Sequence, residues 1–415
     1  MKYAIAVHGT RGDVEPAAAV AVELRRRGHE VKMAVPPNLI DFAESAGLAP
    51  AVPYGPDSQQ QLEADIFRDW YKFRNPLTVL RQAREYVIDG WAEMSATLTT
   101  LAADADLILT GTTYQEVAAN VAEFYGIPLA ALHYFPARTN SKSLPIPMPL
   151  QIARPTFAVA EWAHWRILKP AEDEQRRTLG LPQARSRAVS RIVDGGALEI
   201  QAYDEAFFPG LNEQWGGKRP LVGSITLQLP TEVDQAVSAW VADGTPPIYF
   251  GFGSMPVTDP AEAIAMITAV SAELGERALI CSGVLDLDNV TAADHVKIVR
   301  SVNHAEVFPR CRAIVHHGGA GTTAASVRSG VPTLVLWVGA DQPVWANQIK
   351  RLGVGTAHRF STTTPDSLRD DLRTVLGPAC ASRAAEVATQ MTPPARSLAM
   401  TADLLELAAA NRPTH

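Results

Sequence analysis

The chain of 415 residues lacks several features that would place it in a special class of protein. Its three cysteines, Cys281, Cys311 and Cys380, show no CxxC or zinc-finger spacing; they predict no disulfide framework and suit a reducing cytoplasm. The sequence contains no run of about 18 apolar residues, so it predicts no membrane-spanning helix. Its first residues do not resemble a signal peptide. The net charge of −7, from 37 basic and 44 acidic residues, argues against nucleic-acid binding.

What is present is a repeated order of strand, helix and strand. Residues 2–7 read as a buried strand, residues 14–27 as a helix ended by Gly28, and residues 30–35 as a second strand. This order within 35 residues is typical of a parallel βαβ unit. Four prolines in residues 141–155 predict a long loop. The order recurs at residues 107–110, 115–125 and 127–133.

The pattern restarts in the second half of the chain. Two alternating sets predict two doubly wound α/β domains: residues 1–215, residues 216–395, and a carboxyl-terminal helix over 396–415 that we expect to pack back on the first domain. Because such sheets bind ligands beyond the carboxyl ends of their strands, we expect the active site in a cleft between the domains. The second set comprises strands at 248–252, 278–281, 296–299, 313–316 and 332–337, with helices at 261–274 and 324–329.

A glycine-rich turn, HHGGAGTT, follows one of these strands and precedes a helix. Gly319 and Gly321 let the backbone approach a diphosphate closely, and the helix amino terminus offers unpaired N–H groups with about half a positive charge. Thr322 can add a hydroxyl, and His317 can donate to a phosphate oxygen. A tight turn capped by Thr322, with His317 as an ordinary loop histidine, is the alternative, but the whole string favours a binding site. No DxD-type acidic pair lies nearby, so we expect no metal.

The string HHGGAGTTAASVRSGVPTLVLWVGADQPVWANQIKRLGVG resembles the donor signature of family 1 glycosyltransferases of the GT-B fold. HGTRGDVEPAAAVAVELRRRGHEV, at the start of the chain, is similar to the antibiotic, sterol and glycolipid branch, and GALEIQAYD and PPIYFGFGSM resemble mycobacterial glycopeptidolipid glycosyltransferases. The resemblance covers nearly the whole chain and is weakest between about residues 55 and 200. It implies two Rossmann-like domains facing across a cleft, the first for the acceptor and the second for the nucleotide sugar.

The resemblance also implies further donor-binding residues. Asp341 and Gln342 would read hydroxyls of the donor sugar, because a carboxylate accepts and an amide both accepts and donates. The alternative is that either residue caps a helix whose first turn contains Pro343. Ser254 would contact a phosphate and the backbone of Val302 the base; an ordinary turn serine and a strand-end loop are the alternatives.

One departure from the family bears on the nucleotide. Plant and animal relatives carry a glutamate for both ribose hydroxyls eight residues after the motif histidine, where this chain has Ala325. Losing that carboxylate fits a dTDP-sugar, which lacks the 2′-hydroxyl. A UDP-sugar stays open, since sterol relatives that use UDP-glucose also lack the glutamate.

The first strand-to-helix loop supplies the candidate base. Inverting transfer needs a group that removes the acceptor hydroxyl proton, and the resemblance places this role on Asp13. Asp13 can equally cap the following helix, and both roles can hold together. Arg11 would position Asp13 or the acceptor, or form a surface ion pair. His8 is an alternative base.

The expected function is metal-independent, inverting transfer of a hexose or 6-deoxyhexose, rhamnose or 6-deoxytalose above all, from a dTDP- or UDP-sugar to a hydroxyl of a lipidic acceptor such as a glycopeptidolipid precursor. Such an acceptor would bring the enzyme to the inner face of the plasma membrane. A sterol or antibiotic glucosyltransferase using UDP-glucose, and a non-catalytic sugar-nucleotide-binding protein, are the alternatives. Two aromatic clusters are either core or an acceptor groove: Phe67, Trp70, Tyr71 and Phe73, and Trp162 with Trp165.

Overall fold

The computed structural model describes residues 1–63, 88, 90–143, 149–227, 232–253, 259–283 and 293–411. The chain divides into two compact units, which are described one at a time. Unit 1 consists of Met1–Ala202, Gly210–Leu227 and Pro393–His415, and unit 2 of Tyr203–Pro209 and Gln228–Thr392. The short segment Tyr203–Pro209 thus belongs to unit 2, although the chain on both sides of it belongs to unit 1.

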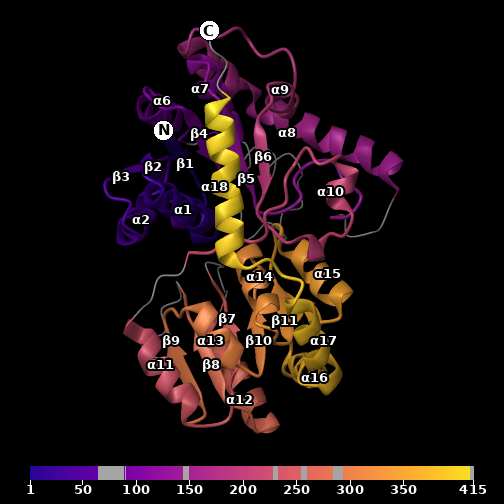
Figure 1. Ribbon diagram of the computed structural model, residues 1–415. Coiled ribbons are helices and arrows are strands. Elements are labelled where there is room, and N and C mark those ends of the chain that lie inside the picture. Colours follow the sequence, from indigo (N-terminus) through magenta and orange to yellow (C-terminus); the bar gives the residue numbers. More distant parts are fainter. Residues whose placement is uncertain are drawn as a thin grey trace. The chain divides into compact units, whose positions relative to one another are not determined.

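Unit 1 contains a six-stranded parallel sheet in the order β3-β2-β1-β4-β5-β6 (Figure 1). The order runs outward in two directions from β1 and β4, so the loops after these two strands lie at the topological switch point. Strands β4 and β5 are buried along their whole length, and β1 and β2 begin with the exposed residues Lys2 and Glu30 and are otherwise mostly buried, as expected of parallel strands covered on both faces. The strands are β1 Lys2–Ala6, β2 Glu30–Val35, β3 Ala51–Pro53, β4 Leu107–Thr110, β5 Leu129–His133 and β6 Leu198–Gln201.

Several helices of unit 1 pack directly on this sheet and others pack on those helices, around a core of buried side chains. The longest, α8, begins at Leu150, so the loop predicted over residues 141–155 is wrong in its second half. Pro155 lies in the second turn of α8, where it removes one backbone hydrogen bond without ending the helix. The helices are α1 Arg11–Arg26, α2 Ile40–Ser45, α3 Ser58–Glu63, α6 Trp91–Leu101, α7 Gln115–Tyr125, α8 Leu150–Thr178, α9 Ala188–Asp194, α10 Leu211–Gln214 and α18 Pro394–Ala410.

The carboxyl-terminal helix α18, yellow in Figure 1, packs on α1 within unit 1. Arg27, just beyond the end of α1, donates hydrogen bonds to Asp403 at 2.6 Å and to Glu406 at 3.0 Å. His29 lies 2.8 Å from the other oxygen of Glu406. These contacts tie the last helix to the first βαβ unit.

Unit 2 contains a second six-stranded parallel sheet, in the order β12-β11-β10-β7-β8-β9. Alternate residues of β7 enter opposite cores, Ile248 and Phe250 on one face and Tyr249 on the other. The strands are β7 Ile248–Gly251, β8 Ala278–Cys281, β9 Val296–Val299, β10 Ala313–His316, β11 Thr333–Trp337 and β12 Gly355–Arg359. The described helices are α11 Glu232–Ala242, α12 Pro260–Leu274, α13 His304–Val307, α14 Ala320–Arg328, α15 Gln342–Leu352, α16 Pro365–Val375 and α17 Pro378–Ala388.

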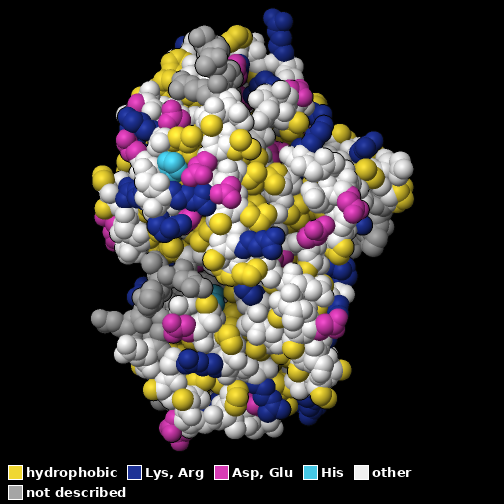
Figure 2. Space-filling view, in the orientation of Figure 1, with side chains coloured by type: hydrophobic (Ala, Val, Ile, Leu, Met, Phe, Trp, Pro, Cys, Tyr) yellow, Lys and Arg dark blue, Asp and Glu magenta, His cyan; other side chains and the backbone are white. Residues whose placement is uncertain are grey.

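The surface is mixed in charge. Figure 2 shows Lys and Arg side chains interspersed with Asp and Glu over the visible face, with no large field of one sign. In the described ranges, no helix is both long enough and apolar enough to span a bilayer.

Candidate functional site

The site in unit 2 is built from the loops after β7 and β10, the two adjacent strands at which the strand order reverses. His317 follows β10, and its imidazole is packed between two glycines. A Cβ at Gly253, in the loop after β7, would lie 2.5 Å from Cε1 of His317, and a Cβ at Gly319 would lie 2.6 Å from its Nε2. Both positions therefore require glycine as long as the imidazole stays there.

Helix α14 starts directly after this turn, with Gly319 as its N-cap residue. The first intrahelical bond runs from the Thr323 N–H to the Gly319 carbonyl at 2.9 Å, so the N–H groups of Ala320, Gly321 and Thr322 have no acceptor within the helix. Gly321 is exposed, and a Cβ there would meet no atom within 4 Å. Within the described part of the chain, this helix end therefore offers an anion three donors and the positive end of the helix dipole.

His316, the residue before His317, braces the turn from inside. Its Nδ1 accepts the Gly318 N–H at 2.9 Å, and its Nε2 lies 3.4 Å from the Ser326 hydroxyl, which donates to the Thr323 carbonyl at 2.8 Å. Burial lowers the pKa of His316 well below its usual value, so the ring is neutral and keeps Nδ1 as an acceptor. Sequence alone does not distinguish this bracing histidine from its neighbour.

His317 is also neutral in the ligand-free protein, because burial lowers its pKa to about 4. Its Nδ1 is buried and makes no hydrogen bond of good geometry in the described part of the chain, although a backbone interaction with Gly251 offsets part of the effect of burial on the pKa. A buried polar atom without a partner is unusual in a folded protein and calls for a ligand or a functional role. His317 therefore offers hydrogen bonding rather than a fixed charge.

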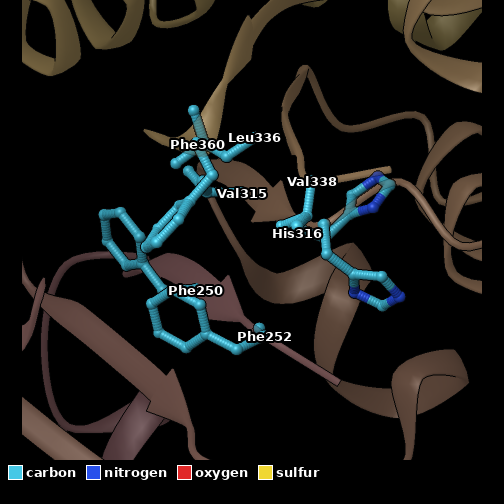
Figure 3. A pocket seen from close by; sticks show the side chains of 9 residues that line it. Phe250, Phe252, Val315, His316, Leu336, Val338 and Phe360 are labelled. Atoms are coloured by element: carbon cyan, nitrogen blue, oxygen red, sulfur yellow. The ribbon is translucent and has the colours of Figure 1, made fainter. Parts of the chain in front are cut away.

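An apolar hollow lies beside the two histidines. Figure 3 shows Phe250, Phe252 and Phe360 on one side of it, and the His316 side chain on another. The hollow has a volume of about 20 Å³, little more than one water molecule needs. Its lining keeps water away from the imidazoles, which explains the depressed pKa of each histidine.

The loop between β11 and α15 contacts the turn. Gln342 accepts the N–H groups of Val338 at 2.7 Å and Gly339 at 3.2 Å through its side-chain oxygen. Gly318 has a φ of +94°, and a Cβ there would lie 3.2 Å from Cβ of Gln342. The glycine turn and the Gln342 loop are thus packed directly against each other.

Asp341 is the N-cap residue of α15 but makes no side-chain capping bond. Its Oδ2 instead accepts the indole N–H of Trp345 at 2.8 Å. Burial raises the pKa of Asp341, and the bond from Trp345 offsets part of that rise. Ala340, just before it, has a φ of +55°, a left-handed conformation that costs a non-glycine residue about 1 kcal/mol. Such strain is typical of functional loops.

Of the two remaining predicted donor-binding residues, one is partly buried beside β9 and the other lies outside the described residues. Val302 follows β9 and packs partly buried against the core on that face of the sheet. Asn303 next to it caps α13 by accepting the Ala305 N–H at 3.0 Å. Ser254 lies outside the described residues.

In unit 1, Asp13 lies in the first turn of α1 at the switch point. Its Oδ2 accepts the backbone N–H of Thr10 at 2.8 Å and the Thr10 hydroxyl at 3.2 Å. The carboxylate folds back over Gly9, where a Cβ would lie only 2.3 Å from Oδ2. Tyr134, after β5, donates its hydroxyl to the backbone carbonyl of Asp13 at 2.7 Å. Asp13 is half-buried and held in one place by these contacts.

The two other candidates of this loop differ in exposure. Arg11 is exposed, pairs with Glu15 at 3.2 Å and lies 4.7 Å over the Phe42 ring. His8 is buried, and its Nε2 lies 3.0 Å from the Pro56 carbonyl, so Nε2 carries the proton. Burial lowers the pKa of His8 as well.

Of the two aromatic clusters, the first lies outside the described residues. Trp162 of the second is 55% exposed on α8, with Ile152 at 56% and Val159 at 66%. A shallow groove of about 370 Å³ runs beside them, lined by Pro155, Ala158, Val159, Trp162 and Arg187. Trp162 is therefore not a core residue.

Comparisons with known proteins decide the family. Residues 3–141 match the model of the glycosyltransferase family 28 N-terminal domain, and residues 281–407 that of the C-terminal domain of erythromycin biosynthesis protein CIII-like proteins. An uncharacterized glycosyltransferase of Mycobacterium tuberculosis is 57% identical over 411 residues, with 99% of each chain covered. The chain belongs to the family 1 glycosyltransferases. It is thus an enzyme, a hexosyltransferase of the antibiotic and natural-product type.

More distant relatives agree with this assignment. The vancomycin aglycone glucosyltransferase of Amycolatopsis orientalis is 30% identical, over 94% of this chain and 93% of that protein. Among solved structures, a calicheamicin glycosyltransferase matches with a TM-score of 0.72 at 18% identity, covering 100% of this chain and 99% of that one. The glycosyltransferase VinC, in complex with dTDP, matches at 0.68 and 20%, covering 99% and 100%. The fold predicted from the sequence, GT-B, is confirmed. The narrower resemblance to glycopeptidolipid enzymes stays a prediction.

Proposed function

We propose that this glycosyltransferase transfers a hexose or 6-deoxyhexose, with inversion, from a dTDP- or UDP-sugar to a hydroxyl of a lipidic acceptor. The observation that carries the donor half of the proposal is the open amino terminus of α14. Three N–H groups and the His317 Nδ1, none of which makes a hydrogen bond of good geometry among the described residues, belong to one turn together with the Thr322 hydroxyl. A diphosphate supplies the negative oxygens that such a turn lacks.

The sugar would lie on the neighbouring loop. Gln342 uses its side-chain oxygen to hold the loop, which leaves its amide nitrogen as the group that meets a hydroxyl. Asp341 uses Oδ2 for Trp345, which leaves Oδ1. Contact between Gly318 and Gln342 keeps the phosphate turn and the sugar loop adjacent, as a sugar diphosphate requires.

In the proposed reaction, Asp13 removes the proton from the acceptor hydroxyl, whose oxygen attacks the anomeric carbon. The bond from that carbon to the diphosphate oxygen breaks, and its electron pair leaves with the nucleoside diphosphate. The α14 N–H groups and His317 stabilise the charge that develops there. Ser254 would assist at the phosphates and Val302 at the base, while Arg11 would help to position the acceptor.

The donor we favour is a dTDP-6-deoxyhexose, rhamnose or 6-deoxytalose. Ala325 offers no carboxylate to a ribose 2′-hydroxyl, and the structurally similar VinC binds dTDP. We also propose that no metal takes part. The turn itself supplies positive potential, and in the described ranges no three His, Cys, Asp or Glu side chains come together as metal ligands would.

The acceptor we favour is amphiphilic, such as a glycopeptidolipid precursor. Support comes from the exposed Ile152, Val159 and Trp162 on α8 and from the groove beside them. Arg154 and Arg166 on the same part of α8 give it a basic character that suits anionic lipids. Such an acceptor would bring the enzyme to a membrane surface.

Product analysis tests the proposal. The enzyme is incubated with dTDP-rhamnose, dTDP-glucose or UDP-glucose, each with extracted cell-envelope lipids, with a sterol or with a glycopeptide aglycone, and the products are identified by mass spectrometry. A deoxyhexosyl lipid is expected. A glucosylated sterol or aglycone formed only from UDP-glucose would favour the second candidate, which the 30% identity to the vancomycin enzyme supports. Donor binding without any product would indicate a non-catalytic protein.

A further inference from the structure

The carboxylate of Asp341 is held by a buried tryptophan. Trp345 is only 1% exposed, yet its indole N–H reaches Asp341 Oδ2 at 2.8 Å. The two residues are four apart and therefore share one face at the start of α15. Asp341 forgoes the usual N-cap bond to the helix backbone for this contact. The indole N–H is thus the main hydrogen-bond donor that orients the carboxylate, with a smaller contribution from the backbone N–H of Asp341 itself.

The Trp345 ring is itself fixed by three aromatic rings from a distant part of the sequence. Tyr203, Phe207 and Phe208 surround it with centroid distances of 6.1, 5.3 and 5.6 Å. All three contacts are edge-to-face, the arrangement that aromatic pairs prefer. These rings belong to Tyr203–Pro209, the segment of unit 2 whose two ends continue into unit 1.

Polar bonds attach the segment to unit 2. Arg351, at the end of α15, donates to the carbonyls of Ala206 at 2.6 Å and Phe207 at 3.0 Å. Asp204 accepts the Thr392 N–H at 2.6 Å and lies 3.9 Å from Arg328, the last residue of α14. The segment is therefore fixed to both helices whose first residues form the candidate donor site.

We propose that Trp345 is a positioning residue for the donor sugar and that Tyr203–Pro209 is the clamp that keeps it in place. The indole N–H fixes Oδ2 of Asp341, so that Oδ1 accepts a hydrogen bond from one sugar hydroxyl. Without that bond the carboxylate can rotate about its side-chain torsions, and the sugar loses its acceptor. The inference rests on the proposed function, since it assigns a role within that donor site.

The test measures how much the sugar adds to nucleotide binding. Calorimetry gives the affinities of dTDP, dTDP-glucose and dTDP-rhamnose, and of UDP and UDP-glucose, for the wild type and for Trp345→Phe. Phenylalanine keeps a ring in the aromatic cluster but removes the N–H. We expect unchanged affinity for dTDP and UDP, and roughly tenfold or greater loss for the nucleotide sugar that binds the wild type best, the usual effect of a lost hydrogen bond to a charged group.

Three further variants and one control separate positioning from packing. Asp341→Ala combined with Trp345→Phe should bind the nucleotide sugar no more weakly than Asp341→Ala alone, because the indole acts only through the carboxylate. Phe207→Leu, which loosens the clamp, should lower sugar-nucleotide affinity in the same direction by about threefold. Trp240→Phe is the matched control, since Trp240 stacks on Arg277 elsewhere in unit 2. It should change neither the affinity for the free nucleotide nor the affinity for the nucleotide sugar.

Equal loss of dTDP and dTDP-sugar affinity in Trp345→Phe, or additive effects in the double variant, would reduce Trp345 to a packing residue and overturn the inference. If Trp345→Phe does not fold, as thermal unfolding will show, Phe207→Leu decides the question. Failure of the wild type to bind any of these nucleotides would instead contradict the proposed function itself.

Discussion

The turns that begin α1 and α14 share a backbone arrangement but differ in whether they contain an acidic side chain. Each follows a central parallel strand at a switch point, and each opens with a glycine in the left-handed region, Gly9 at a φ of +140° and Gly318 at +94°. In unit 1 the first helical turn contains its own carboxylate, Asp13, bonded back to Thr10. In unit 2 the corresponding turn contains no acidic residue and starts at Gly319, which has no side chain to donate or accept.

The difference shows how one backbone motif can serve two roles. Where the protein supplies an anion to the helix end, as at α1, the field of the helix holds a carboxylate that can act on a substrate. Where the protein supplies no anion, as at α14, the same field and the N–H groups can bind an anion of the substrate. Four substitutions or treatments probe this contrast, in order of expected effect.

The largest effect is expected at α1. Asp13→Asn should slow transfer by about 10²–10⁴, the usual contribution of a positioned base, while the melting temperature and nucleotide affinity stay near those of the wild type. Asparagine keeps an oxygen for the Thr10 N–H, so the cap survives and only the proton acceptor is lost. Turnover and thermal unfolding are measured together.

A mutant with a lower melting temperature but normal turnover per folded molecule would assign Asp13 to capping alone. Wild-type values for both quantities would direct the search to His8, whose ring is buried against the Pro56 carbonyl.

Placing a carboxylate at α14 should erase the contrast between the two turns. Gly321→Asp adds the charge where a Cβ meets no atom within 4 Å, so the fold should tolerate it and the helix should gain up to about 1 kcal/mol. We expect dTDP and UDP affinity to fall by about 2–3 kcal/mol, since charged hydrogen bonds are lost. Gly321→Ala is the control and should bind nearly normally. Unchanged affinity in the aspartate variant would place the diphosphate elsewhere.

The imidazole of His317 sharpens the comparison, because His8 holds the matching position before Gly9 in unit 1 but its Nε2 already lies 3.0 Å from the Pro56 carbonyl. His317→Ala should lower dTDP and UDP affinity and turnover together, by about 1.5–3 kcal/mol, through loss of one bond to the diphosphate. His358→Ala, a half-buried histidine of unit 2 paired with Asp371, should leave affinity unchanged. Calorimetry that finds no difference between the His317 variant and the wild type would remove the phosphate role.

The smallest effect is expected from removing metal. If α14 supplies the positive potential that a divalent cation supplies elsewhere, turnover in EDTA should equal turnover in magnesium or manganese. Initial rates in both conditions, with the identified donor, make the comparison. Loss of activity in EDTA that magnesium or manganese restores would contradict the proposal.

The sequence predicted the fold through its buried strands and missed strands at the sheet edges. β3, β6 and β12 were not predicted, and each lies at an edge of its sheet. β12, Gly355–Arg359, is half-exposed and largely polar, so it lacks the apolar run that marks an interior strand. β6 contains Glu199, whose burial depends on ion pairs with Arg138 and Arg219 from distant loops. α8 was missed in part because its prolines suggest a loop.

The site could be predicted only as far as short motifs extend. The glycine turn and the Asp341-Gln342 pair stand in continuous strings, so their placement together follows from the strand order. α14 begins at Ala320 rather than Ala324, because helix propensity alone cannot show that a Gly-Ala-Gly-Thr sequence is helical. The different tasks of His316 and His317 depend on ring orientation, and the clamp on Trp345 joins residues more than a hundred positions apart, so neither follows from spacing.

A crystal structure of the enzyme with dTDP or UDP tests the central claim most directly. Oxygens of the diphosphate should lie within about 2.7–3.2 Å of the backbone nitrogens of Gly321 and Thr322, with His317 in contact through a ring nitrogen. A diphosphate bound away from α14, with those N–H groups facing solvent, would contradict the claim.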